Sequence, residues 1–371
     1  MKILHKQFDT TWSWTEIAKG LFKYLDHDVE TEPSHKRTDC DRYDVILTQQ
    51  PFMMKNIDNR KKVVTRIGSN SLFEQGRYNM NEIGRYMKEC FAVIATNRYL
   101  YNEAKKYNNN VVFIPNGLDL KEWTVLPKKK GKFTVGFVGN INNPAYRKYK
   151  GFDLLEKACK EMNIHLKTAL YGEKQIPHDR MRADFYSKVS CIVHPTEGEG
   201  CSNTIMETLA CGIPVITTKT AGFHGEMLEQ GKNVLFCERT VESIKECIGW
   251  LRKDQKLHKR LKKEGRKFAE ENHDIQQVAK EYDKVIRACY EANKNRITEQ
   301  NPDQGEKVKV QALKSVYLDK IGKKVRGEVF EMRKDQALKL QGVVNILDVE
   351  EVSGPAADKM MRAPVKSKGV V

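Results

Sequence analysis

The sequence predicts an α/β protein in which two parallel β-sheets, each covered by helices, form separate domains. Short apolar runs of the kind found in buried strands, such as residues 44–48 and 62–65, alternate with helical stretches through the first 127 residues. The alternation starts again at residue 132, and a chain of 371 residues exceeds one typical domain. Strands that alternate with helices form parallel sheets with helices on both faces, so two such sheets are expected.

Changes in composition mark the expected domain boundaries. Residues 1–127 make the first domain, and the basic run at residues 128–131 leads into the second domain, which spans 128–273. Four parts follow: a helix at 274–295, a polar linker at 296–305, a small α+β module at 306–350 and a disordered tail at 351–371. Within the module, the expected elements are strands at 308–313, 327–331 and 342–347 and a helix at 335–340.

The composition excludes several classes of protein. A hydrophobic content of 40% is ample for packed cores, and no apolar run approaches the length of a membrane span. The first five residues begin a strand rather than a signal peptide. The nine cysteines are odd in number and form no Cys-x-x-Cys pair, so reduced thiols and a cytoplasmic location are expected. The nine histidines lack the spacing of metal ligands, so no structural zinc is expected.

The most informative stretch is residues 199–216, which predict a loop, a helix and a strand. Ser202, Asn203 and Thr204 are small polar residues of the kind that cap the free N–H groups where a helix begins. Gly212 is expected to end the helix before an apolar strand. A helix start with free amides is a ready site for a phosphate group.

Two acids stand at the ends of this loop-to-helix junction. Glu199 precedes the helix, and Glu207 lies inside it, where its carboxylate can face a ligand lying across the helix end. The pattern therefore predicts a nucleotide diphosphate on the helix tip, with one carboxylate for the ribose and one for a sugar.

Residues 199–216 resemble the C-terminal domain of family 4 glycosyltransferases, which have the GT-B fold. That family carries two glutamates separated by seven residues, then a small-residue helix, Cys-Gly-x-Pro and an apolar strand. Glu199 and Glu207 hold this spacing, and residues 207–216 match the rest. The resemblance implies two Rossmann-like domains that face a cleft, with the small C-terminal module appended. It also implies that Glu207 holds the ribose and Glu199 the donor sugar.

Further segments extend the resemblance in the same order. Residues 111–119 are similar to the family's Pro-Asn-Gly-x-Asp segment, and residues 133–140 form an expected strand. The family has an arginine where Asn140 stands, so the resemblance implies that nearby basic residues supply the positive charge. The implied donor-binding residues are Gly139, Asn140, Gly200, Cys201, Ser202, Asn203, Thr204 and Glu207, and the implied catalytic residues are Glu199, Arg147 and Lys150.

The first domain is expected to hold the acceptor. Trp12 and Trp14 stand where relatives have a glycine-rich loop, and they form either a stacking platform for a sugar or base, or interdomain packing. Many relatives carry a histidine after the strand equivalent to residues 63–65, whereas Arg66 follows here. Arg66 is assigned either to an anionic group of the acceptor or to a structural ion pair, and no general base is assigned.

The resemblance implies a nucleotide-sugar-dependent glycosyltransferase that retains the anomeric configuration. Departure of a nucleotide diphosphate needs positive charge and oriented amides. No Asp-x-Asp motif follows a suitable strand, and GT-B enzymes generally do without a bound metal in the chemistry. The expected ligand is therefore a nucleotide-diphosphate sugar, most commonly a UDP-sugar, with no further cofactor and no metal.

The acceptor stays open at the level of sequence. The net charge of +16 favours a polyanion or an anionic surface as partner. The C-terminal module resembles those appended to bacteriophage proteins, and its expected role is to dock a protein partner. One hypothesis is thus a bacteriophage DNA-modification enzyme that glycosylates a hydroxymethylated base in the host cytoplasm. The alternatives are transfer to a cell-surface polysaccharide or lipid carrier at an anionic membrane surface, and a non-catalytic protein that binds nucleotide sugars or DNA.

Overall fold

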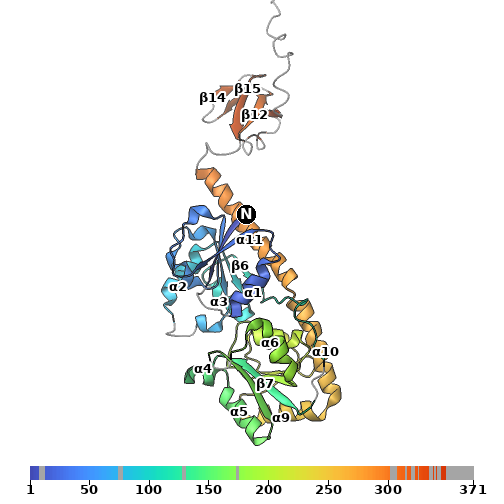
Figure 1. Cartoon of the computed structure of the whole chain (residues 1–371). Coiled ribbons are helices and arrows are strands. Elements are labelled where there is room, and N and C mark those ends of the chain that lie inside the picture. Colours follow the sequence, from blue (N-terminus) through green and yellow to red (C-terminus); the bar gives the residue numbers. More distant parts are fainter. Residues whose placement is uncertain are drawn as a thin grey trace, which may run out of the picture. The chain divides into compact units, whose positions relative to one another are not determined.

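The computed structural model describes most of the chain as two compact units, Met1–Asn293 and Lys294–Val371 (Figure 1). Its described residues are 1–7, 13–73, 78–127, 131–172, 175–300, 307–313, 316–318, 322–324, 326–333, 337, 340 and 344–347. Among these residues, every helix is too short or too polar to cross a membrane. The first unit holds the two large sheets and the candidate site.

The first sheet has six parallel strands in the order β2-β1-β3-β4-β5-β6. The strands are β1 (Lys2–Gln7), β2 (Asp28–Pro33), β3 (Val45–Thr48), β4 (Val63–Ile67), β5 (Ala92–Ala95) and β6 (Val111–Phe113). The central strands β3, β4 and β5 are buried along their whole length. This explains why they appear in the sequence as continuous apolar runs rather than as an alternating pattern.

Helices cover both faces of this sheet. The α-helices of the domain are α1 (Ser13–Phe22), α2 (Met80–Glu89) and α3 (Arg98–Lys105), and the short 3-10 helices are η1 (Cys40–Arg42), η2 (Pro51–Asn56), η3 (Arg60–Lys62) and η4 (Asn70–Leu72). One apolar cluster joins the sheet to α2 and α3, and another joins it to α1 and to the last long helix, α11 (Ile275–Gln300). α11 thus returns from the second domain to pack on the first.

The second sheet has five parallel strands in the order β11-β10-β9-β7-β8. They are β7 (Thr134–Gly139), β8 (His165–Leu170), β9 (Cys191–His194), β10 (Val215–Thr217) and β11 (Leu235–Phe236). Its helices are α4 (Pro144–Tyr149), α5 (Phe152–Glu161), α6 (His178–Asp184), η5 (Tyr186–Lys188), α7 (Asn203–Ala210), α8 (Phe223–Met227), α9 (Val241–Lys253) and α10 (Gln255–Asn272). One apolar cluster packs α5 and α9 on this sheet, and another packs α7 and α10 on it.

The second unit contains a small antiparallel sheet. β12 (Lys307–Ala312) pairs with β15 (Val329–Arg333) on one side and with β16 (Val344–Leu347) on the other. A separate hairpin joins β13 (Val316–Leu318) to β14 (Gly322–Lys324), and this hairpin was not predicted from the sequence. Most of the expected helix at 335–340 and all of the expected tail at 351–371 lie outside the described residues.

The structure confirms the predicted fold class of two parallel-sheet α/β domains with a small C-terminal sheet. One boundary differs from the expected one: α11 continues to Gln300, through the beginning of the predicted linker at 296–305. The residues there, Ile297 to Gln300, include good helix formers, and a polar composition does not prevent a helix from continuing.

Candidate active site

The N-terminus of α7 forms one wall of the candidate site. Ser202 caps the helix, and its Oγ accepts a hydrogen bond from the backbone N–H of Ile205. The helix ends near Gly212, whose φ of 64° lies in the left-handed region where an amino acid with a side chain is strained. The first N–H groups of an α-helix have no partner within the helix. The tip of α7 is therefore suited to bind an anion.

Glu199 lies on the loop between β9 and α7 and is held from two sides. Its Oε1 atom forms an ion pair with Nζ of Lys150. The same oxygen lies 2.8 Å from Nε2 of His194, the last residue of β9. Burial by itself would raise the pKa of the Glu199 carboxyl, but the Lys150 ammonium and the His194 hydrogen bond outweigh it and lower the pKa to about 2. Glu199 is therefore an ionised carboxylate across the physiological pH range.

The backbone around Lys150 explains why a glycine follows it. Lys150 is the C-cap of α4, and Gly151 has a φ of 66°. A Cβ atom at position 151 would lie 2.3 Å from the carbonyl oxygen of Pro195, on the loop that carries Glu199. Only glycine allows the two segments to approach this closely. The close approach brings the side chains of Lys150 and Glu199 together.

Arg147 does not join this cluster. Its guanidinium forms ion pairs with Asp153 and with Glu156, the latter at 2.8 Å, and it lies 4.5 Å from the ring centroid of Phe152. All three partners belong to the first turns of α5. The structure therefore accounts for Arg147 as a residue that joins α4 to α5, and only one of the two expected cations lies beside Glu199.

The end of β7 carries Gly139 and Asn140. The side-chain oxygen of Asn140 accepts a hydrogen bond from the backbone N–H of Asn142 at 3.0 Å, so it shapes its own turn. An asparagine is neutral, so Asn140 cannot supply the positive charge of the arginine that stands at this position in the family that the sequence resembles. The cation that lies beside Glu199 is Lys150.

Glu207 lies one turn inside α7 and is nearly fully buried. Its Oε2 atom accepts a hydrogen bond from the hydroxyl of Tyr186 at 2.7 Å, and its Oε1 atom lies 3.0 Å from Nε2 of His178. The ring of Trp123 packs against both His178 and Tyr186. Burial and the Glu207 carboxylate raise the pKa of Tyr186 well above its ordinary value, so the phenol stays a hydrogen-bond donor.

The first domain contacts the loop before α7 directly through two asparagines. The Nδ2 atom of Asn97 donates to the backbone carbonyls of Glu199 and Gly200, at 3.2 and 3.1 Å. The Nδ2 atom of Asn116 contacts the carbonyl of Cys201 at 2.9 Å and Oδ1 of Asn203 at 2.8 Å. These bonds fix the position of the loop that precedes α7.

Gly200 lets the two domains meet at this loop. A Cβ atom at position 200 would lie 1.9 Å from the carbonyl oxygen of Gly68, in the segment that follows β4. Any side chain here would push the two segments apart. Gly200 is therefore required by packing, in addition to any contact with a ligand.

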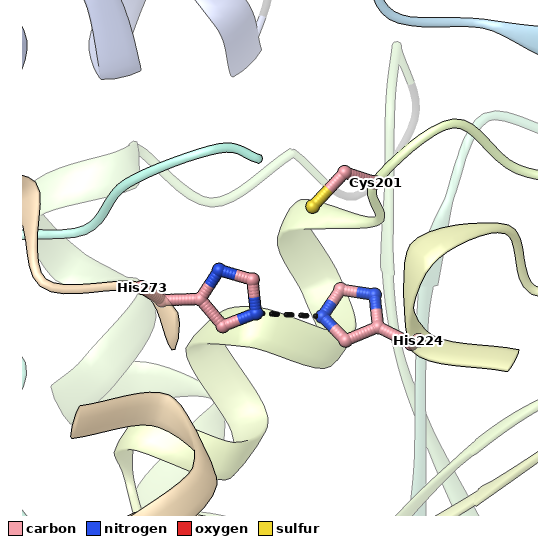
Figure 2. A group of neighbouring side chains, drawn as sticks. All are labelled: Cys201, His224 and His273. Atoms are coloured by element: carbon pink, nitrogen blue, oxygen red, sulfur yellow. Dashed lines mark hydrogen bonds between the residues drawn. The ribbon is translucent and has the colours of Figure 1, made fainter. Parts of the chain in front are cut away.

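Three further predicted residues are Thr204, Cys201 and Arg66. Thr204 is half-buried in the first turn of α7. The side chain of Cys201 is directed toward His224 and His273 (Figure 2), and its backbone carbonyl accepts a hydrogen bond from Asn116. Arg66 is buried, and its Nη2 donates to Oδ1 of Asn116 at 2.6 Å. Burial lowers the pKa of Arg66, opposed by contact with Tyr282.

The structure does not test the two tryptophans that are predicted to lie on the acceptor side. Trp12 lies outside the described residues, and Trp14 belongs to α1, where only its backbone is described. Both remain predicted acceptor-side residues.

Five residues that were not predicted from the sequence hold the predicted ones in place: His194 beside Glu199, Tyr186 and His178 beside Glu207, and Asn97 and Asn116 beside the loop before α7. Asn97 and Asn116 end two apolar strand-like segments, which was a usable signal because strand ends line ligand sites in α/β folds. Tyr186 and His178 carried no such signal.

Part of the second domain matches a known family. Residues 174–268 match the model of the family described as Glycosyl transferases group 1. This segment contains Glu199, α7 and Glu207, whereas Lys150 lies before it.

Two proteins of similar sequence are described as uncharacterized glycosyltransferases. The chain is 26% identical over 240 residues to one from Methanocaldococcus jannaschii, across 58% of this chain. It is 22% identical over 240 residues to one from Haemophilus influenzae, across 57% of this chain. Each match spans 66% of the relative's own length.

Solved structures show the same architecture at low sequence identity. HepE of Anabaena in complex with UDP-glucose superposes with a TM-score of 0.64 at 13% identity, over 78% of this chain and 100% of that one. Sucrose-phosphate synthase of Thermosynechococcus elongatus gives 0.62 at 13% identity, over 79% of this chain and 100% of that one. The protein thus has the GT-B fold of these structures, and residues 174–268 are similar to the Glycosyl transferases group 1 family.

Proposed function

We propose that the protein is a glycosyltransferase that moves a sugar from a nucleotide-diphosphate sugar to an acceptor hydroxyl. One observation carries the proposal: two carboxylates flank the N-terminus of the same helix, α7. They belong to Glu199, which pairs with Lys150, and to the buried Glu207. The helix tip supplies amides for a diphosphate, and the two carboxylates offer acceptors for hydroxyl groups on either side of it. The family match over residues 174–268 supports the proposal.

The donor is proposed to lie with its ribose at Glu207 and its sugar at Glu199. A carboxylate can accept hydrogen bonds from both hydroxyls of a ribose. Tyr186 and His178 hold the carboxylate of Glu207 in one orientation. We assign a uridine nucleotide because HepE is described in complexes with UDP and UDP-glucose, and its fold matches this chain.

Lys150 is proposed to stabilise the leaving group. As the bond between the sugar and the diphosphate breaks, negative charge grows on the phosphate oxygens, and a nearby ammonium and the α7 amides stabilise that charge. In the structure, Lys150 is paired with Glu199. Donor binding would therefore shift part of the Lys150 interaction from a carboxylate to the diphosphate.

We further propose that the reaction retains the anomeric configuration. In this mechanism the acceptor oxygen attacks the face from which the diphosphate leaves, and the diphosphate takes the acceptor's proton. The sugar–oxygen bond to the diphosphate breaks as the new sugar–oxygen bond forms, so atoms and charge balance without a covalent intermediate on the protein.

For the acceptor, the net charge of +16 favours a polyanion, and hydroxymethylated DNA is the acceptor that we propose to test first. A bacteriophage origin would fit that acceptor. A surface glycan or a lipid carrier at an anionic membrane is the alternative. The C-terminal sheet is proposed to dock the partner that carries the acceptor.

The test is a matrix of nucleotide sugars against acceptors. The full chain is incubated with each nucleotide sugar and with hydroxymethylated DNA, unmodified DNA or a lipid-linked glycan, and the products are analysed by mass spectrometry. A hexose or pentose added to the hydroxymethylated nucleoside alone supports the DNA acceptor. A sugar added only to the glycan supports the alternative. If the protein releases no nucleotide and transfers no sugar with any of the nucleotide sugars, the proposed function is overturned.

A further inference from the structure

Three side chains that are distant in the sequence meet in the interior of the second domain. Cys201 precedes α7, His224 lies in α8, and His273 follows α10 (Figure 2). Both histidines are fully buried, and Cys201 is nearly so. One potential ligand atom from each of the three side chains lies within 4.8 Å of the other two. Figure 2 shows the sulfur of Cys201 directed toward the two rings.

The hydrogen bonds define the protonation of His273. Its Nδ1 atom lies 2.8 Å from the backbone carbonyl oxygen of Asn116, an acceptor, so Nδ1 must carry a proton. In this tautomer the lone pair of His273 is on Nε2, which faces Nε2 of His224 at 3.1 Å.

This arrangement is the one that metal-binding histidines adopt. A histidine ligand commonly binds the ion through one nitrogen and donates its other N–H to a carbonyl, which fixes the ring's orientation. In a tetrahedral zinc site with bonds of 2.0–2.1 Å, two nitrogen ligands lie about 3.3 Å apart. The observed 3.1 Å between the two Nε2 atoms is close to that separation.

We propose that Cys201, His224 and His273 form a binding site for a thiolate-preferring transition-metal ion, with Zn²⁺ as the occupant. A thiolate and two imidazoles suit zinc, and water would complete a tetrahedron. Binding releases the thiol proton of Cys201. The proton on Nε2 of His224 moves to Nδ1, which is buried and without a hydrogen-bond partner among the described residues. The charge of the ion is then balanced in part by the thiolate.

The position of the site suggests a structural role. The segment around Asn116 leaves the first domain, and the segment around His273 returns to it. The two segments are bonded side by side, since Leu118 N–H donates to the His273 carbonyl at 2.8 Å and Ile275 N–H to the Leu118 carbonyl at 3.1 Å. Cys201 belongs to the loop that carries Glu199. A bound ion would therefore tie the interdomain connection to the candidate donor loop.

Sequence spacing could not reveal this site. The histidines are 49 residues apart, and they meet only because the chain returns from α10 to the edge of the first domain. The expectation of no structural zinc rested on the spacing of the histidines along the sequence. Spacing does not detect ligands that come together only in the folded chain, as Cys201, His224 and His273 do. The proposed site is independent of the proposed glycosyl transfer, because its first readout is metal content.

The experiment measures metal in the full chain. The protein is purified without a histidine tag after growth in zinc-supplemented medium, dialysed against metal-free buffer and analysed by inductively coupled plasma mass spectrometry. We expect about one zinc per chain in the wild type and at least a fivefold loss in Cys201→Ser and in His224→Gln. Cys247→Ala, at a buried cysteine of α9, is the matched control and should keep the zinc.

A second measurement on the wild type keeps the test valid if the variants do not fold. Cobalt added after chelation should produce the absorption of a thiolate–cobalt bond, and zinc should raise the melting temperature. A folded wild type that holds no metal and gives no cobalt–thiolate absorption overturns the proposal. The cluster would then be a neutral pair of hydrogen-bonded histidines beside a buried thiol.

Discussion

The Nε2 atom of His194 lies 2.8 Å from Oε1 of Glu199, the same oxygen that pairs with Lys150. Burial lowers the pKa of His194, although the Glu199 carboxylate opposes this. The neutral ring therefore donates its Nε2 proton and orients the carboxylate without adding a second positive charge. Glu199 is thus fixed in place and ionised before a ligand arrives.

We expect Lys150→Ala to lower kcat by at least tenfold while changing donor affinity less, because the ammonium stabilises charge that develops only as the diphosphate leaves. Arg147→Ala is the matched control. Its guanidinium is engaged by Asp153 and Glu156, so its loss should leave kcat within about threefold. Steady-state kinetics of nucleotide release would check both variants. Equal losses in the two would place Arg147 in the site after all.

Removing the carboxylate of Glu207 should weaken donor binding. A hydrogen bond to a charged group contributes roughly 1.5–3 kcal/mol, so Glu207→Ala should raise the donor Kd by about tenfold or more. Tyr186→Phe keeps the carboxylate and removes only the hydroxyl that donates a hydrogen bond to Oε2 of Glu207 at 2.7 Å. This variant should weaken binding of the nucleotide sugar less than Glu207→Ala does. Calorimetric titration with the nucleotide measures both. An unchanged Kd in Glu207→Ala would show that the ribose lies elsewhere.

The variant Glu199→Gln distinguishes recognition of the donor sugar from binding of the nucleotide. If Glu199 holds the hydroxyls of the donor sugar, the variant should lose sugar transfer and bind the free nucleotide as the wild type does. Glutamine keeps the size of the side chain but removes the charge that pairs with Lys150. Parallel titrations with UDP and a UDP-sugar distinguish the cases. An equal loss of affinity for both ligands contradicts this placement.

The free energy of unfolding should fall as the pH is lowered from 6.5 toward 3, because His5 is buried as a neutral ring. Burial lowers the pKa of His5 to about 3 from 6.5, so the folded protein keeps the ring neutral while the unfolded chain binds a proton below about pH 6.5. The stabilisation is therefore complete above pH 6.5 and is lost as the pH falls toward 3, by at most about 1.4 kcal/mol per pH unit. His5→Leu should flatten the dependence of melting temperature on pH between 6.5 and 4. Identical slopes in the variant and the wild type would rule out a contribution from His5.

If DNA is the acceptor, binding should weaken steeply with salt, because lysines and arginines displace counterions from the phosphates. Fluorescence anisotropy at several salt concentrations measures the slope. A neutral glycan acceptor would show little dependence. The absence of binding to any DNA at low salt, where attraction is strongest, would leave the glycan or lipid carrier.

The sequence predicted those features that depend on local chemistry. Ser202 and Gly212 determined where α7 begins and ends, because capping and left-handed backbone are properties of single residues. The pairing of Lys150 with Glu199 was not evident from spacing, and the two residues were assigned to one site through the family resemblance.

Features that depend on competing partners were not predicted. The sequence did not predict that Asp153 and Glu156 on α5 pair with Arg147, and a place for Arg147 beside the diphosphate stays a prediction. The cluster of Cys201, His224 and His273 likewise depends on how three distant segments pack, which no local pattern encodes.

The most direct test of the account is whether the amide at the tip of α7 binds the diphosphate. Asn203 is the first residue of this helix, and Ser202 before it has φ −70° and ψ 118°, a conformation that tolerates a following proline. Asn203→Pro removes the backbone N–H, whereas Asn203→Ala keeps it and loses the same side-chain bond to Asn116. By calorimetry, Asn203→Pro should bind UDP roughly tenfold more weakly than Asn203→Ala, with uridine unaffected. Equal UDP affinity in the two variants would contradict a nucleotide diphosphate on this helix.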